Sequence, residues 1–61
     1  MRYFRDDGFL FRMPDGDVAT SMKKMEVWDK KWLQVDDLES RSHAVWFGMP
    51  MNVADLDTDQ V

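Results

Sequence analysis

Two tryptophans, Trp28 and Trp32, flank the charged tripeptide Asp29-Lys30-Lys31 and admit two different folds. As a hairpin, residues 25–28 and 32–35 pair across the tripeptide and place the two indoles opposite each other. As a helix, Asp17 is the N-cap and an apolar stripe follows at Val18, Met22, Met25, Trp28, Trp32 and Val35. The β-branched and aromatic residues favour the hairpin, although its loop lacks the glycine usual in such loops.

A second hairpin is predicted at the N-terminus, where "RYFRDDGFLFRM" places two aromatic segments around Asp-Asp-Gly. A three-residue loop, residues 6–8, sets Arg5 opposite Phe9 and Phe4 opposite Leu10. That register places Tyr3, Phe9 and Phe11 on one face of the hairpin and Phe4 and Leu10 on the other. Pro14-Asp15-Gly16 then predicts a reversal of the chain.

A helix is predicted over residues 36–47. Asp36 is the expected N-cap, with Glu39 completing a capping box, and Gly48 is expected in the left-handed position past the end. The apolar stripe is thin until Val45 and Trp46, so the C-terminal half of this helix is expected to rest on the sheet.

These elements predict a small α+β fold, an antiparallel meander of three to four strands with the helix of residues 36–47 packed on one face. The alternative is one N-terminal hairpin plus two helices. Residues 1–48 are expected to form a single globular domain, and residues 49–61 an acidic tail or an extended arm.

The motifs "YFR", Asp-Gly, "FLFR", Glu-x-Trp and a second Trp resemble a group of short open reading frames from actinobacteria and their phages. The resemblance covers residues 2–35 and implies aromatic hairpins with a tryptophan pair. Many of those sequences have glycine in the second hairpin loop, where this chain has Lys30 and Lys31. The resemblance implies no known activity.

Composition excludes several classes of protein. The chain has 61 residues, no cysteine and a net charge of −4, so disulfide frameworks and thiolate metal sites are absent. No apolar run is long enough to cross a membrane, and the N-terminus meets acidic residues before any apolar segment. We therefore expect a small acidic cytoplasmic protein.

Reactive groups are sparse, and we expect no enzyme. His43 is the single histidine, and Ser40 and Ser42 lie too close along one helix to be presented to it as an activated nucleophile. "DLDTDQV" matches the first ligands of a calcium loop but lacks the glycine and the closing glutamate. No cofactor and no metal are predicted.

The supply of aromatic and methionine side chains is larger than one short sheet can bury, which predicts a non-catalytic protein-protein interaction module. The expected partner-binding residues are Trp28, Trp32 and Trp46 as anchors, with Lys30 and Lys31 as a charged rim. One alternative is a nucleic-acid binder that uses Lys30, Lys31, Trp28 and Trp32, which the net charge disfavours. Another is a self-associating structural protein, for example a homodimer.

Overall fold

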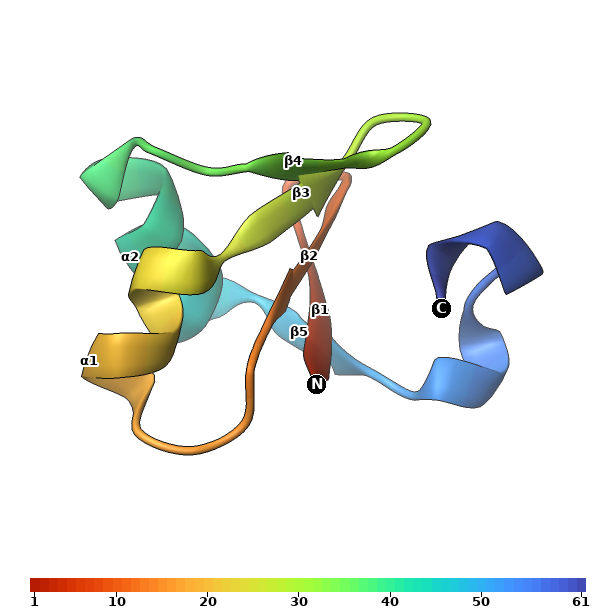
Figure 1. Cartoon of the computed structure of the whole chain (residues 1–61), viewed down its shortest axis with the longest axis horizontal. Helices are drawn as coiled ribbons and strands as arrows, with labels where there is room; N and C mark the ends of the chain where they lie inside the picture. Colours follow the sequence, from red (N-terminus) through yellow and green to blue (C-terminus); the bar gives the residue numbers. More distant parts are fainter.

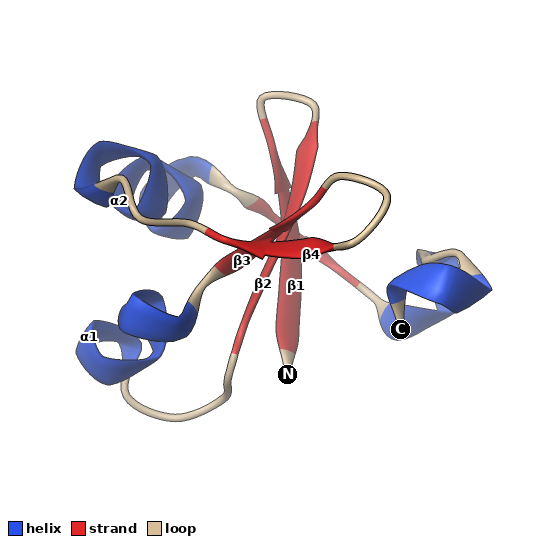
Figure 2. Cartoon of the chain, turned by 45° about the horizontal axis from the view of Figure 1, so that its top comes forward, coloured by secondary structure: helices blue, strands red, loops and turns tan.

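The computed structural model describes all 61 residues and has an α+β fold, as the sequence predicts. One antiparallel sheet has five strands, not the predicted three to four, in the order β4-β3-β2-β1-β5 (Figure 1). The strands are β1 (Arg2–Asp6), β2 (Phe9–Met13), β3 (Glu26–Trp28), β4 (Trp32–Gln34) and β5 (Met49–Met51). The helices α1 (Val18–Ser21) and α2 (Leu38–Phe47) lie on the same side of the sheet in Figures 1 and 2.

The β1–β2 hairpin forms, but its register differs by one residue from the predicted one. Asp6 pairs with Phe9, so the loop is the two-residue turn Asp7-Gly8. Both residues have positive φ, 53° and 83°, which is the backbone of a type I′ turn and matches the twist of the strands. The predicted three-residue loop is wrong because Asp7, although not a glycine, adopts the left-handed conformation.

This register changes which side chains share a face of the hairpin. Phe4 pairs with Phe11, and both lie on the face that α2 covers. Tyr3 is opposite Arg12 and therefore points to the other face, together with Leu10. Tyr3 thus does not share a face with Phe9 and Phe11, and the core on the helix side contains Phe4, Phe11, Met13, Met25, Val35 and Ala44.

Both interpretations of residues 17–35 are correct over part of the segment. Asp17 caps α1 by accepting a hydrogen bond from the Thr20 amide at 3.0 Å, and a 3-10 turn continues the helix over Met22–Lys24. From Glu26 onward the hairpin forms as predicted, with Trp28 opposite Trp32. The long helix is therefore wrong beyond residue 25, and the missing glycine is replaced by Lys30, which has φ of 63°.

Helix α2 begins at Leu38, two residues after the start of the predicted range 36–47, and its N-cap is one residue later than predicted. Asp37, not Asp36, is the N-cap, and its carboxylate accepts hydrogen bonds from the amide and the hydroxyl of Ser40 at 3.1 and 2.7 Å. Gly48 is not left-handed, since its φ is −66°. A β-carbon at residue 48 would clash with the Ala44 carbonyl oxygen and lie 3.0 Å from a ring carbon of Phe4. Glycine is needed there for close packing.

Residues 49–61, predicted as an acidic tail or an extended arm, begin with a strand of the sheet. In β5, Met49 pairs with Arg5, Pro50 with Phe4 and Met51 with Tyr3. Beyond β5, two 3-10 turns, Val53–Asp55 and Thr58–Gln60, lead to the C-terminus. They lie across the sheet from α1 and α2 (Figure 1).

A glycine at position 30 is expected to stabilise the fold. Lys30→Gly removes the steric cost of holding a residue with a side chain in the left-handed backbone conformation. We expect the free energy of unfolding to rise by about 0.5–1 kcal/mol. Urea unfolding followed by circular dichroism measures the change. Lys31→Gly is the control, because Lys31 does not have positive φ; an equal gain from both variants would contradict the explanation.

Three aspartates have pKa values below the usual range of the group. The N-terminal ammonium donates a hydrogen bond to Asp15 and lowers the pKa of its carboxyl. The pKa of Asp17 is lowered by hydrogen bonds from the amide and then the hydroxyl of Thr20, and that of Asp37 by the hydroxyl and then the amide of Ser40. All three contacts favour the charged carboxylate in the folded state.

These shifts predict acid sensitivity. A carboxyl whose pKa is lower in the folded chain stabilises the fold above the unfolded value, 3.8, and loses that contribution as the pH falls through the folded pKa. We expect the urea concentration at the unfolding midpoint to decrease when the pH is lowered below about 4. The decrease should be smaller in the triple variant Asp15→Asn/Asp17→Asn/Asp37→Asn. The triple variant Asp29→Asn/Asp55→Asn/Asp59→Asn controls for net charge. If its urea midpoint depended on pH as weakly as that of the first variant, the assignment would be contradicted.

Candidate functional site

The Trp28–Trp32 pair is packed into the sheet on the face opposite α2. The two indoles meet edge to face with ring centroids 5.2 Å apart. The ring centroid of Tyr3 lies 6.0 Å from that of Trp32. The guanidinium of Arg12 sits 4.1 Å above the Trp32 ring, and its Nε donates to Glu26 Oε1 at 2.8 Å. These contacts use the ring surfaces of Trp32 to stabilise the fold.

The structure brings four of the five predicted partner-binding residues together and separates the fifth. Trp28 and Trp32 end the strands of the β3–β4 hairpin, and Lys30 and Lys31 are exposed in its loop. Trp46 lies on α2, which covers the opposite face of the sheet. The predicted residues therefore form no single site.

Trp46 is not packed on the sheet as predicted; it is the most exposed large apolar side chain, with 78% of its surface accessible. Ala44, which is 1% exposed, makes the contact between α2 and the core. The small alanine allows α2 to approach the sheet closely. Val45 is partly buried and also packs against the core, whereas Trp46 and Phe47 are exposed.

Two further apolar residues of α2 share the exposure of Trp46. Leu38 is 68% and Phe47 is 72% accessible. With Trp46 they line a shallow hollow of about 370 Å³, which we call the outer groove, completed by Glu39, Ser42 and His43. The His43 and Phe47 rings lie 4.8 Å apart at one side of it.

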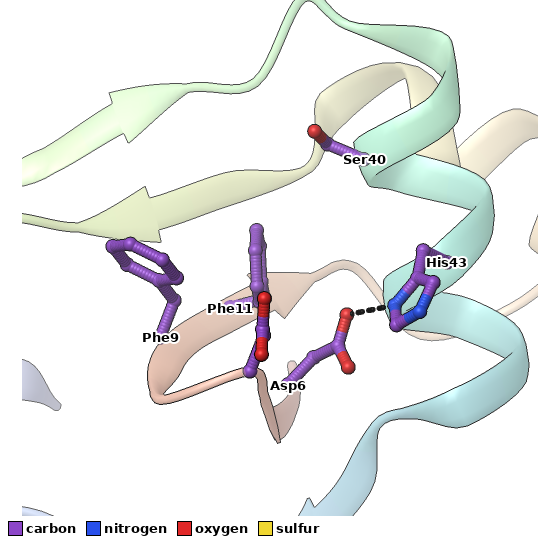
Figure 3. Close-up of a pocket in the computed structure, with 6 residues that line it drawn as sticks. Asp6, Phe9, Phe11, Ser40 and His43 are labelled. Carbon is purple, nitrogen blue, oxygen red and sulfur yellow. Dashed lines mark hydrogen bonds and ion pairs between the residues drawn. The ribbon is translucent and has the colours of Figure 1, made fainter.

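A second hollow of about 200 Å³ lies between the tip of the β1–β2 hairpin and α2 (Figure 3). This hairpin hollow is lined by Asp6, Asp7, Phe9, Phe11, Ser40 and His43. His43 Nδ1 lies 2.6 Å from Asp6 Oδ2, a contact between residues 37 positions apart in the sequence. The Asp6 side chain is 10% exposed and the His43 side chain 56%. The pair links α2 to β1.

Asp6, His43 and Ser40 share a hollow, but the serine is not aligned with the pair. The Ser40 hydroxyl donates to Asp37 Oδ2 at 2.7 Å, which is its N-cap contact. In Figure 3 the Ser40 oxygen points away from the imidazole. A nucleophile activated by histidine needs a direct hydrogen bond to the ring, so this geometry does not arrange one.

A third hollow of about 260 Å³, the sheet hollow, adjoins the second between β2, β3 and the start of α2. It shares Phe9, Phe11 and Ser40 with the hairpin hollow and adds Val27, Val35, Asp36 and Asp37. Phe9, at the hairpin tip, is 57% exposed. No group of three or more histidine, aspartate or glutamate side chains converges in a way that could hold a metal ion.

Sequence reasoning missed Leu38, Phe47 and Asp6 as members of the candidate site. Leu38, six residues before Ala44, lies on a different part of the helix surface, so its exposure follows once Ala44 is the buried residue. Phe47, three residues after Ala44, shares its face, so the helical pattern does not explain why Phe47 is exposed. The helical spacing from Ala44 thus identifies Leu38 as an exposed apolar residue but not Phe47. Asp6 could not be found, because its approach to His43 depends on the register of the hairpin.

No protein-family model, curated protein or solved structure matches the chain. None of its helices has the length and apolar character needed to cross a bilayer. The geometry of the chain itself therefore carries the functional argument.

The tryptophans are expected to differ sharply in their contribution to stability. Trp32→Ala removes a packed ring with two aromatic neighbours and a cation–π contact, and we expect a loss of about 2–3 kcal/mol. Trp46→Ala should change the free energy of unfolding by less than about 0.5 kcal/mol. Urea unfolding followed by far-ultraviolet circular dichroism compares the two; similar losses would contradict the assignment of Trp46 to the surface.

Proposed function

We propose that this protein is a non-catalytic interaction module that docks on a larger protein through the outer groove of α2. The observation that carries the proposal is the exposure of Leu38, Trp46 and Phe47, each more than two thirds accessible on one short helix. Apolar side chains exposed singly are common, but a contiguous group of large ones marks an interaction surface. Tryptophan is also among the residues that dominate binding energy at interfaces.

The packing of the chain supports assigning these residues to binding, not to folding. The core on the helix side is complete without them, since Phe4, Phe11, Met25 and Ala44 are buried. Burial of apolar area contributes about 25 cal/mol per Å², so leaving three large side chains in water gives up stability that a partner can restore. The loose resemblance to actinobacterial and phage sequences fits an accessory protein of this kind.

Docking through α2 is favoured over nucleic-acid binding through the β3–β4 hairpin. Base stacking needs an open aromatic face beside basic side chains. Trp32 has Arg12 over its ring and Trp28 against its edge, which leaves little open surface for a base. Lys30 and Lys31 lie in the β3–β4 loop and do not line the outer groove, so they have no role in this proposal.

Site-specific photocrosslinking in the native cell tests the proposal. The chain is expressed with a photoreactive benzoyl-phenylalanine in place of Trp46, or in place of Thr20 as a control on the exposed surface of α1. We expect one discrete adduct with another protein from position 46 and none from position 20. An excess of unlabelled wild-type chain should abolish the adduct.

A competition control and the mass of the adduct identify what binds at position 46. Unlabelled Trp46→Ala/Phe47→Ala should fail to compete, because it lacks the proposed anchors while retaining the core. An adduct of twice the mass of the chain would identify self-association instead. The absence of an adduct at position 46, or the same adducts from both positions, would refute the proposal.

A further inference from the structure

The hollows around α2 share one electrostatic character. Two carboxylates line the hairpin hollow, one lines the outer groove and two line the sheet hollow, which makes five in all. They are Asp6, Asp7, Glu39, Asp36 and Asp37. No lysine or arginine lines any of the three hollows, although the chain has eight of them. The apolar surface of α2 is thus bordered by a single sign of charge.

Neighbouring hollows share lining residues. His43 lines both the outer groove and the hairpin hollow, and Phe9, Phe11 and Ser40 line both the hairpin hollow and the sheet hollow. We call the combined surface the acidic face. It runs from Trp46 and Phe47, past His43, to Phe9 at the hairpin tip.

We propose that the acidic face binds a cationic amphipathic helix of the partner protein, its apolar side chains on Trp46, Phe47 and Leu38 and its lysines or arginines beside the carboxylates. The inference rests on the proposed function and names the chemistry of its partner. Amphipathic helices commonly dock in apolar grooves through residues spaced along one face. Complementary charge at the border selects the partner and speeds its encounter.

The dimensions of α2 fit such an occupant. Leu38 and Trp46 are eight residues apart in one helix, which at 1.5 Å per residue is about 12 Å. An aligned partner helix spans that length in about two turns, enough for apolar anchors at spacings of three and four residues. The carboxylates of Asp36 and Asp37 precede the helix, and Glu39 lies in its first turn.

Charge also argues against two other occupants. Two copies of the chain joined symmetrically through the acidic face would oppose two sets of five carboxylates, and like charges across an interface are unfavourable. Phosphate backbones and anionic membrane surfaces carry the same sign as this face and would be repelled. A cationic protein segment is the partner whose charge complements the four exposed carboxylates, Asp7, Asp36, Asp37 and Glu39, since Asp6 already contacts His43.

A direct binding measurement tests the inference with a defined probe. The probe is a fluorescein-labelled peptide of leucine and lysine, about 14 residues long and patterned as an amphipathic helix. Fluorescence anisotropy measures its affinity for the full chain. We expect saturable binding that weakens severalfold when sodium chloride rises from about 50 to about 300 mM, and no binding of a leucine–glutamate peptide of the same pattern.

Matched variants test the location of binding. Asp7→Asn/Asp36→Asn/Glu39→Gln changes the net charge from −4 to −1 on the acidic face, and we expect about tenfold weaker binding. Asp29→Asn/Asp55→Asn/Asp59→Asn makes the same change of charge elsewhere and should bind like the wild type. Trp46→Ala should also weaken binding about tenfold. Circular dichroism confirms that each variant is folded.

The outcomes separate this inference from the proposed function. Equal losses in the two neutralised variants would overturn the inference, because they would show a general effect of net charge. Failure of the wild type to bind the leucine–lysine peptide would also overturn the inference. The proposed docking through the outer groove would then still be tested separately by the crosslink at position 46. If sedimentation showed a concentration-dependent dimer that Trp46→Ala abolished, the inference would be overturned, because the occupant of the acidic face would be a second copy of the chain.

Discussion

The two-residue turn Asp7-Gly8 fixes the register of the central hairpin, and most of the structure depends on that register. Because the side chains of a strand alternate, the observed pairing directs Phe4 and Phe11 toward α2 and Tyr3 and Leu10 toward the other face. It also directs Asp6 toward α2, where it meets His43. A shift of one residue would remove the core on the helix side and the contact that links α2 to β1.

The two faces of the sheet are completed by different means. On the helix side, Ala44 and Gly48 have little or no side chain, which allows the chain of α2 and β5 to approach Phe4 closely. On the other side, aromatic rings and the Arg12–Glu26 pair cover the strands without a helix. The three tryptophans therefore divide into the packed pair Trp28 and Trp32 and the exposed Trp46.

Sequence predicts the elements of this protein better than their relative placement. Local signals identify the N-terminal hairpin and the helix that ends at Phe47. They leave the Trp28–Trp32 hairpin as the favoured of two interpretations, because its loop lacks the usual glycine. The register of β1–β2 depends on whether Asp7 takes a left-handed conformation, which aspartate permits but does not require. The exposure of Trp46 depends on which side of α2 meets the sheet, and its weakly amphipathic pattern does not specify that side. The acidic face follows from both features, so its hollows could not be derived from the sequence.

The outer strands β4 and β5 have three residues each, and this shortness has a consequence for solubility at high concentration. An exposed strand is a template on which another chain can add, and repeated addition leads to fibres. Pro50 in β5 has no amide hydrogen to offer, and Lys30 and Lys31 precede β4 with two positive charges. The sheet thus resists growth at both edges, even though the aromatic rings of Phe9, Trp46 and Phe47 are exposed.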